Sequence, residues 1–216
     1  MSEFTGKIVL ITGAGRGLGR ELARQFASHG AIVAANDLTP VNVDEVVTEI
    51  IAAGGKAKSY LTDVAKKVAV QAMLTELLED WGRLDILVNY ANVHPQTPLL
   101  DMDDWDWGRV IDVNLTAAFL MLQSAGRVMR ELGGGVIVNI GASAQTNSQQ
   151  EHLAAYQSAK QGVIALTIAA ARELAQHNIR VNAVCHHEDD LKKAAQQVLG
   201  LCHPENESTG EIINCV

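Results

Sequence analysis

Tyr156 and Lys160 stand four residues apart, and Ser143 lies thirteen residues before the tyrosine. If residues 151–177 form a helix, this spacing places the phenol and the ammonium side by side on one helix face. A free tyrosine has a pKa of about 10 and is a poor acid–base catalyst near neutrality, but an adjacent ammonium stabilises the phenolate and lowers that pKa. Together with a glycine-rich turn at residues 12–19, the pair indicates hydride chemistry on a bound dinucleotide.

The glycine-rich turn carries Gly13, Gly17 and Gly19. The spacing is G-x-x-x-G-x-G and departs from G-x-G-x-x-G, because Leu18 stands where the latter has its third glycine. Glycines permit a tight turn and close backbone approach, and the next helix points free N–H groups at a pyrophosphate. Glycines also end strands for steric reasons, so the motif alone is weak. Its position between the first predicted strand and the first predicted helix favours a dinucleotide site.

Two charged residues bear on the choice of cofactor. Asp37 follows the second predicted strand, where a carboxylate accepts hydrogen bonds from the ribose 2′- and 3′-hydroxyls and repels a 2′-phosphate. Arg16 favours the opposite choice, because a guanidinium binds a 2′-phosphate bidentately, although an exposed loop charge is the alternative for this residue. Desolvating a carboxylate against a phosphate dianion is costly, so we expect NAD(H) in preference to NADP(H).

The bulk properties restrict the partners. The chain has 216 residues, 48% of them hydrophobic, with a net charge of −8 and a pI near 5.3. This composition predicts one domain, 1–216, with a sizeable core. Because Lys and Arg are neither in excess nor clustered, neither nucleic acid nor an anionic membrane is an expected partner, which leaves small molecules and copies of the chain itself.

The spacing of the cysteines and the length of the apolar segments indicate the expected cellular location of the protein. The three cysteines, Cys185, Cys202 and Cys215, are spaced without a metal or redox pattern, so we expect reduced thiols in the cytoplasm. No apolar stretch approaches the length of about twenty residues that a membrane span needs, and the segment at residues 8–11 is too short for a signal peptide.

Short β-branched runs alternate with longer segments of helical period. The predicted strands are 8–11, 31–34, 57–61, 85–88, 136–140, 179–184 and 211–215. The predicted helices are 17–29, 41–53, 65–80, 104–132, 152–177 and 188–199. This alternation predicts an α/β fold, a Rossmann-like doubly wound and mostly parallel seven-stranded sheet with helices on both faces.

The chain resembles the short-chain dehydrogenase/reductase family over residues 5–184. Within it, the glycine turn and residues 36–38 are most similar to bacterial 3-oxoacyl reductases and the hydroxyacyl dehydrogenases of β-oxidation. The motifs that carry the resemblance, in chain order, are Gly13/Gly17/Gly19, Asp37, residues 61–64 (Leu-Thr-Asp-Val), residues 89–92 (Asn-Tyr-Ala-Asn), Val113-Asn114, Ser143 and Tyr156-x-x-x-Lys160.

The resemblance implies a set of cofactor contacts. Asp63 would contact the adenine amino group and Val64 would help with its backbone, although Asp63 could also be the N-cap of the helix at 65–80. Asn89 and Ala91 would line the cofactor ribose. The whole implied cofactor set is Gly13, Arg16, Gly17, Leu18, Gly19, Asp37, Asp63, Val64, Asn89, Ala91, Tyr156 and Lys160.

The resemblance also implies a catalytic set that interconverts a ketone and a secondary alcohol. In reduction Ser143 donates a hydrogen bond to the substrate carbonyl, Tyr156 gives it a proton, and the nicotinamide delivers hydride. Lys160 tunes the tyrosine and bonds the nicotinamide ribose, and Asn114 holds a water that connects the lysine to solvent. A homodimer or homotetramer through the helices at 104–132 and 152–177 is also implied. The small residues of the second helix suit either that seam or a tightly buried internal helix.

Two departures from the family leave a second hypothesis open. The turn at residues 89–92 has a side chain where the family has its closing glycine. After residue 184 the family continues into a long substrate lid, whereas this chain goes almost directly to its last helix, so the lid is predicted to be truncated and the pocket open. A non-catalytic or weakly active dinucleotide-binding or interaction protein on the same fold is therefore the alternative.

Two further clusters of residues resemble a binding site, but we expect each to have a structural role. Trp105 and Trp107 are expected to anchor the start of the helix at 104–132 on the core. Adjacent histidines diverge and no two histidines are spaced i,i+4, so the acidic residues of the second cluster are expected to stabilise a helix N-terminus and no metal is predicted. That second cluster consists of His186, His187, Glu188, Asp189, Asp190 and His203.

Overall fold

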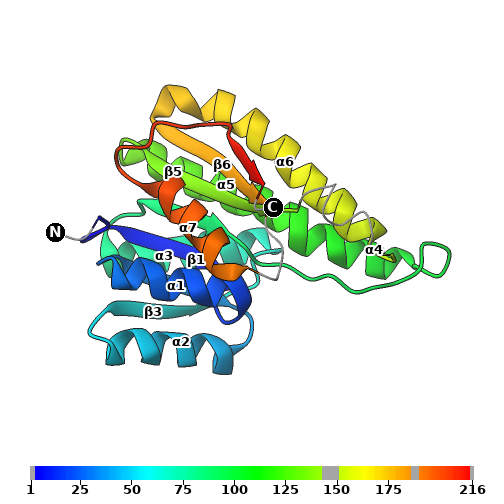
Figure 1. Cartoon of the computed structure of the whole chain (residues 1–216), viewed down its shortest axis with the longest axis horizontal. Helices are drawn as coiled ribbons and strands as arrows, with labels where there is room; N and C mark the ends of the chain where they lie inside the picture. Colours follow the sequence, from blue (N-terminus) through cyan, green and yellow to red (C-terminus); the bar gives the residue numbers. More distant parts are fainter. Residues whose placement is uncertain (1–2, 143–150, 186–189, 215–216) are drawn as a thin grey trace.

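The computed structural model describes residues 3–142, 151–185 and 190–214 (Figure 1). The strands are β1 (Ile8–Thr12), β2 (Ile32–Asp37), β3 (Lys56–Leu61), β4 (Ile86–Asn89), β5 (Gly135–Gly141), β6 (Ile179–Cys185) and β7 (Ile212–Asn214). The helices are α1 (Gly17–Ser28), α2 (Pro40–Ala52), α3 (Lys67–Trp81), α4 (Asp104–Ile111), the π-helix η1 (Asp112–Thr116), α5 (Ala117–Glu131), α6 (Ala154–Leu174), the 3₁₀-helix η2 (Ala175–His177) and α7 (Leu191–Cys202).

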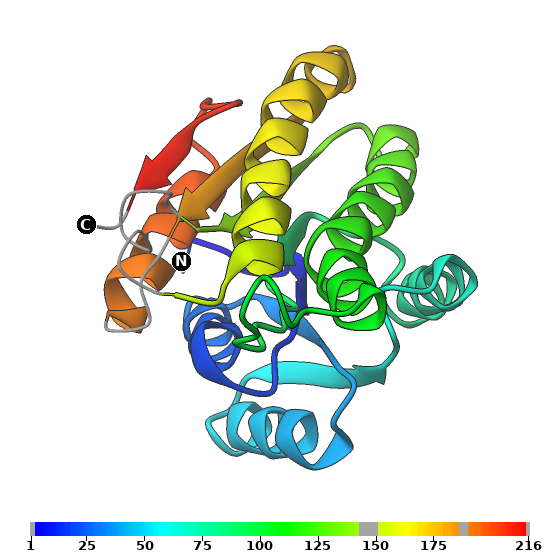
Figure 2. The same cartoon turned by 90° about the vertical axis from the view of Figure 1, so that its right-hand side faces the viewer.

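The strands form one sheet in the order β3-β2-β1-β4-β5-β6-β7, and neighbouring strands in it are parallel. Helices cover both faces of this sheet (Figures 1 and 2). The predicted doubly wound α/β architecture is confirmed, and each predicted strand is present with its ends shifted by at most three residues.

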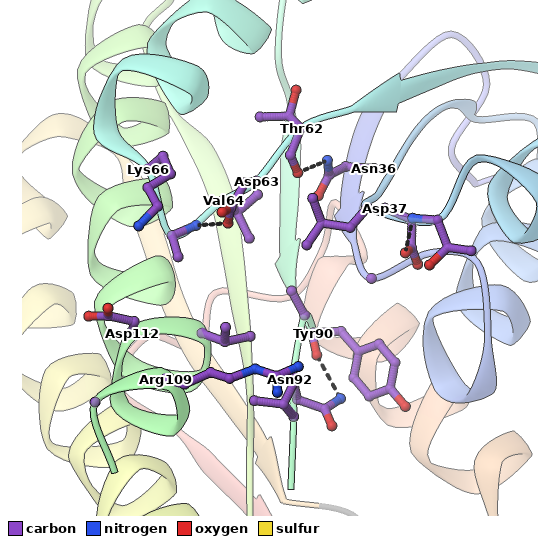
Figure 3. Close-up of a pocket in the computed structure, with 18 of the residues that line it drawn as sticks. Asn36, Asp37, Thr62, Asp63, Val64, Lys66, Tyr90, Asn92, Arg109 and Asp112 are labelled. Atoms are coloured by element: carbon purple, nitrogen blue, oxygen red, sulfur yellow. Dashed lines mark hydrogen bonds between the residues drawn. The ribbon is translucent and has the colours of Figure 1, made fainter. Parts of the chain in front are cut away.

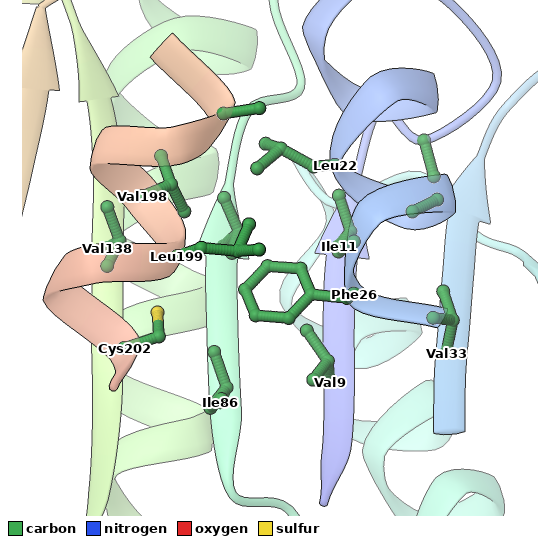
Figure 4. Close-up of a cluster of buried hydrophobic side chains, with 14 of the residues drawn as sticks. Val9, Ile11, Leu22, Phe26, Val33, Ile86, Val138, Val198, Leu199 and Cys202 are labelled. Carbon is green, nitrogen blue, oxygen red and sulfur yellow. The ribbon is translucent and has the colours of Figure 1, made fainter. Parts of the chain in front are cut away.

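Successive residues of β1 pack into different cores. Val9 and Ile11 join α1, α2 and α7 on one face, whereas Ile8 and Leu10 join α3, α5 and α6 on the other. Figure 4 shows the first of these cores, where the Phe26 ring of α1 lies between α7 and the sheet. Neighbouring strand residues point to opposite faces, so a strand buried on both sides is expected to be mainly apolar, as β1 is from Ile8 to Ile11.

Four neighbouring strands bury a polar residue at the same level near their carboxyl ends. Asn36, Thr12, Asn89 and Asn139 follow one another in the register of β2, β1, β4 and β5, and each is at most 6% exposed. The Asn89 amide donates to the Asn139 side chain (2.8 Å), which in turn donates to Thr167 Oγ1 of α6 (2.9 Å). Because buried polar groups are costly without partners, this polar row fixes the strand register and ties α6 to the sheet.

The predicted helix at 104–132 is present, but its middle is a π-helix and not an α-helix. It consists of α4, the π-helix η1 and α5, and the Ala117 N–H bonds to the Asp112 carbonyl five residues earlier. The Asn114 side chain is responsible, since its amide donates to the Val110 carbonyl (2.9 Å), the acceptor that an α-helix reserves for a backbone N–H. The same amide also donates to the Val93 carbonyl (2.7 Å), in the segment after β4.

Two smaller expectations are also corrected. Asp63 is not a helix N-cap, because α3 begins at Lys67 and its N-cap is Lys66; the Asp63 carboxylate instead accepts the Ala65 N–H (2.9 Å). Trp105 and Trp107 do not anchor α4 on the core, since they are 67% and 42% exposed. The Arg109 guanidinium lies over the Trp105 ring at 5.5 Å.

The connection after β6 consists of residues 186–190, because β6 ends at Cys185 and α7 begins at Leu191. Asp190 caps α7 by accepting the Lys193 N–H (2.9 Å). Of the cysteines, Cys185 and Cys202 are buried, and Cys215 lies outside the described residues. In the part of the chain that the structure describes, no helix has the length and apolar character needed to cross a bilayer.

Candidate active site

A cavity of about 650 Å³ opens at the carboxyl ends of β1 to β4 (Figure 3). It lies beside the point where the chain order reverses across the sheet, since β1 pairs with β2 on one side and with β4 on the other. Ligands of open α/β sheets bind at such switch points. The predicted residues on its wall are Gly13, Arg16, Asp37, Asp63, Val64 and Ala91.

Asp37 ends β2 at the rim of this cavity. Its carboxylate accepts the Gly15 N–H (3.0 Å) through one oxygen and the Thr39 N–H (3.0 Å) through the other. An ionised carboxylate has about four acceptor positions, so two remain for hydroxyl groups of a ligand. Asp37 therefore both shapes the glycine turn and presents a fixed negative charge to the cavity.

Asp63 and Val64 follow β3, the strand next to β2, and line the same side of the cavity. The buried Asn36 amide donates to the Tyr60 carbonyl (2.9 Å) and the Thr62 carbonyl (3.0 Å), which holds the end of β3 in place. Figure 3 shows these residues across the cavity from Arg109 and Asp112 of the helical region after β4. The cavity thus has a polar rim on the side of β2 and β3 and a second wall that Trp105 and Arg109 of α4 help to form.

The glycine turn brings β1 and the start of α1 into close contact. Gly13 and Gly17 have positive φ values of 68° and 52°, which side chains rarely adopt. A Cβ on Gly19 would lie 2.2 Å from the Gly13 carbonyl oxygen, so only a glycine permits this approach. The N–H of Leu18, between the last two glycines, donates to the Tyr90 hydroxyl (3.4 Å).

Lys160 and Asn114 line a second, much smaller cavity of about 10 Å³, together with Asn89 and Ala91. That volume has room for about one water molecule. Among the described residues, the side-chain oxygens of Asn89 and Asn114 are buried and have no hydrogen-bond partner. Two unpaired acceptors beside an ammonium are the groups that a bound water would satisfy.

Lys160 is buried in α6, and its ammonium donates to the Ile140 carbonyl of β5 (2.9 Å). Burial lowers the pKa of Lys160 to about 8, because the charged form loses its hydration, and the nearby Cys185 opposes this shift. The half-buried Tyr156 stands one helical turn before it, with the lysine Nζ 5.7 Å from the centre of the tyrosine ring. The expected adjacency of phenol and ammonium on one helix face is present.

The predicted site residues thus fall into those that line the large cavity, those that line the small cavity, and those that line neither of the two. Tyr156 borders neither cavity, and Ser143 lies outside the described residues. The Leu18 side chain belongs to the core, so its backbone alone faces the turn. Among the described residues no group of three potential metal ligands occurs, and residues 186–189 of the histidine and acid cluster lie outside them.

Sequence reasoning missed residues that position this site. Thr12 Oγ1 accepts the backbone N–H groups of Tyr90 (3.0 Å) and Ala91 (3.1 Å), and so joins the end of β1 to the segment after β4. Asn139 holds Asn89, as described above, and an asparagine within an apolar strand was a signal for it. His94 lies beside the candidate catalytic tyrosine, with its ring 5.7 Å from that of Tyr156, and no sequence pattern indicated it.

Comparison with known proteins decides the family. The family model described as short chain dehydrogenase matches residues 7–188. The chain belongs to the short-chain dehydrogenase/reductase family. Members of this family are oxidoreductases that act on alcohol or carbonyl groups and use NAD(P)(H).

Individual relatives agree with this assignment. A short chain dehydrogenase/reductase of Aspergillus oryzae is 39% identical over 95% of this chain and 80% of its own length. The 3-oxoacyl-[acyl-carrier-protein] reductase of Thermotoga maritima is 37% identical over 84% of this chain and 74% of its own. A solved short-chain dehydrogenase/reductase from Burkholderia xenovorans superposes with a TM-score of 0.94 at 30% identity, covering 99% of this chain and 96% of that one. The resemblance stated from the motifs is confirmed.

The pKa of Lys160 predicts a pH-dependent stability. Burial lowers this pKa from 10.5 to about 8, so between these pH values the unfolded chain binds more protons than the folded chain. The free energy of unfolding should therefore rise with pH across this window. Compared with Lys160→Met, which does not titrate, the natural chain should gain on the order of 3 kcal/mol between pH 8 and 10.5. Urea unfolding at several pH values measures the difference, and parallel curves would contradict the assignment.

Proposed function

We propose that the chain is an NAD(H)-dependent oxidoreductase that interconverts a ketone and a secondary alcohol. The observation that carries this proposal is the pairing of Tyr156 with the buried ammonium of Lys160. This lysine lines the small cavity, which shares Val64 and Ala91 with the nucleotide-sized cavity whose rim bears Asp37. A volume of about 650 Å³ lies within the range of small-molecule and cofactor sites. The proposed substrate is a small carbonyl compound or alcohol.

Tyr156 is the proposed acid and base. In the reductive direction its hydroxyl gives a proton to the carbonyl oxygen as that oxygen gains negative charge, and in oxidation the phenolate takes the proton back. Ser143 is proposed to donate a hydrogen bond to the same oxygen. Bound NAD(H) supplies or accepts the hydride. Lys160 would stabilise the phenolate, since an ammonium at this distance favours the charged form of a neighbouring acid.

Lys160 and Asn114 are proposed to return the proton. The small cavity between them has room for about one water, and the unpaired oxygens of Asn114 and Asn89 would accept that water's hydrogens. The Asn114 amide is already used by Val93 and Val110, so its oxygen is held in a fixed direction. The π-helix at this residue is therefore proposed to serve catalysis, as π-bulges often do.

Asp37 supports NAD(H) as the preferred cofactor. Its charge at the rim would repel a 2′-phosphate, and its two remaining acceptor positions suit the ribose hydroxyls. Arg16 is exposed at the start of α1 and lines the same cavity, so it is the cation that would meet a 2′-phosphate if the Asp37 charge were removed.

Replacing Tyr156 by Phe should abolish proton transfer and keep the ring. We expect turnover to fall by roughly 10²- to 10⁴-fold, while NADH still binds with its original affinity. The measurement is NADH oxidation with a panel of ketones, together with NADH titration of the variant. Turnover by the natural chain would also reject the alternative of a non-catalytic binding protein, whereas unchanged turnover in the variant would remove Tyr156 from the mechanism.

Replacing Asp37 by Asn should relax the cofactor preference. The substitution keeps an acceptor oxygen for Gly15 and removes the charge that opposes a 2′-phosphate. The ratio of kcat/KM for NADH to that for NADPH should fall at least about tenfold, equivalent to about 1.4 kcal/mol. An unchanged ratio would show that Asp37 does not select the cofactor.

A homo-oligomer through α5 and α6 is also part of the proposal. A groove of about 330 Å³ between these helices is bordered by Phe119, Leu166 and Ala169, and Phe119 is exposed. A charge introduced into an apolar interface would be buried without a partner, so Ala169→Glu should reduce a dimer or tetramer to smaller species, whereas Ala72→Glu on α3 should not. Sedimentation velocity measures this, and a monomeric natural chain would refute the oligomer.

A further inference from the structure

The Tyr90 side chain occupies the hollow over the glycine turn. Its hydroxyl lies 2.7 Å from the position that a Cβ on Gly17 would take, and its ring atom Cδ1 lies 2.8 Å and 3.4 Å from the corresponding positions on Gly19 and Gly13. The space that these three glycines leave free is therefore filled in part by a residue of the chain itself.

The backbone of Tyr90 is held from two directions. Its N–H donates to Thr12 Oγ1 (3.0 Å), and its carbonyl accepts the Asn92 side-chain amide (3.0 Å). In Figure 3 the Tyr90 ring extends away from Lys66 and Asp112 on the far side of the cavity. These contacts fix the residue where its phenol reaches the first turn of α1.

The Tyr90 hydroxyl accepts a hydrogen bond from a backbone N–H that could otherwise bind an anion. Leu18 is the second residue of α1, and its N–H is one of the backbone donors that a helix leaves free at its N-terminus. The Arg16 side chain does not cap this end of the helix. The Leu18 N–H instead points at the Tyr90 hydroxyl, with the nitrogen and oxygen 3.4 Å apart.

A phosphate oxygen and the phenol oxygen cannot share this place. A phosphate oxygen bonded to the Leu18 N–H would lie about 2.9 Å from the nitrogen, along the same direction. It would then overlap the hydroxyl, which is 3.4 Å from that nitrogen. In agreement, the large cavity is lined by Gly13, Arg16 and Tyr90 but not by Gly17, Leu18 or Gly19, so it ends at the tyrosine.

We propose that Tyr90 competes with the cofactor pyrophosphate for the N-terminus of α1 and thereby sets the cofactor affinity of this chain. The inference rests on the proposed NAD(H) site. The adenosine half of the cofactor binds in the large cavity without moving the tyrosine. The pyrophosphate reaches the glycine turn only when the phenol leaves it, so part of the binding free energy is used to displace Tyr90.

The test compares adenosine with ADP, since the two differ by the diphosphate. NMR titrations of the natural chain, Tyr90→Phe and Tyr90→Ala give the dissociation constants. Losing one hydrogen bond of the free protein should tighten ADP binding by roughly 2- to 10-fold in Tyr90→Phe. Tyr90→Ala, which also clears the ring, should tighten it further. Adenosine affinity should stay the same in all three proteins.

Tyr60→Phe is the matched control, because it removes a tyrosine hydroxyl that bonds to Asp80 and Trp81 outside the large cavity and should leave ADP affinity unchanged. Thermal melting confirms that each variant is folded. Equal or weaker ADP binding in Tyr90→Phe, with adenosine bound normally, would overturn the competition and leave the proposed function standing. If no variant binds adenosine or ADP, the nucleotide site itself is refuted and this inference with it.

Discussion

The row of buried polar residues across β2, β1, β4 and β5 is the constraint on which the site depends. Asn36, Thr12, Asn89 and Asn139 are buried at one level of a parallel sheet, and each follows an apolar run in its own strand. A slip of one residue in any strand would leave these groups without partners and turn its apolar set to the wrong face. The row thus sets the height at which each strand ends and the next segment begins.

Each member of this row positions part of the site. Thr12 holds the segment that begins with Tyr90, and Asn36 holds the end of β3 before Asp63. Asn139 connects β4 to α6 through Thr167, about two helical turns after Lys160 on the same helix. Hydrogen bonds in the sheet interior, where such bonds are stronger than in water, therefore hold the buried lysine in a fixed position relative to the large cavity.

The two sides of the site have different electrostatic character. The lysine side is buried, and this burial destabilises the ammonium and lowers the pKa of Lys160 to about 8. The nucleotide side is open and polar, with Asp37 held by two backbone N–H groups. Between them, the phenol of Tyr90 lies against the start of α1. An acid–base centre needs the first environment, whereas a charged ligand that must enter and leave needs the second.

The strand and helix periodicities were sufficient to predict the fold, because apolar runs buried on both faces of a parallel sheet leave few alternatives. The i,i+4 spacing likewise predicted the adjacency of Tyr156 and Lys160. Both results follow from local rules of backbone geometry. The π-helix within the helix at 104–132 did not follow from such rules, since the Asn114 amide that bonds to the Val110 carbonyl there is also held by Val93, 21 residues away in the chain.

By itself, the sequence determined the family, the doubly wound fold and the set of candidate residues, because ordered motifs and hydrophobic periods are local properties. Only the tertiary structure decided that Asp63 caps no helix, that Trp105 lies at the cavity and not in the core, and that Tyr90 covers the glycine turn. The physical reason is the same in each case. Which donor a side chain meets, and whether water reaches it, depends on segments that folding brings together from distant parts of the chain.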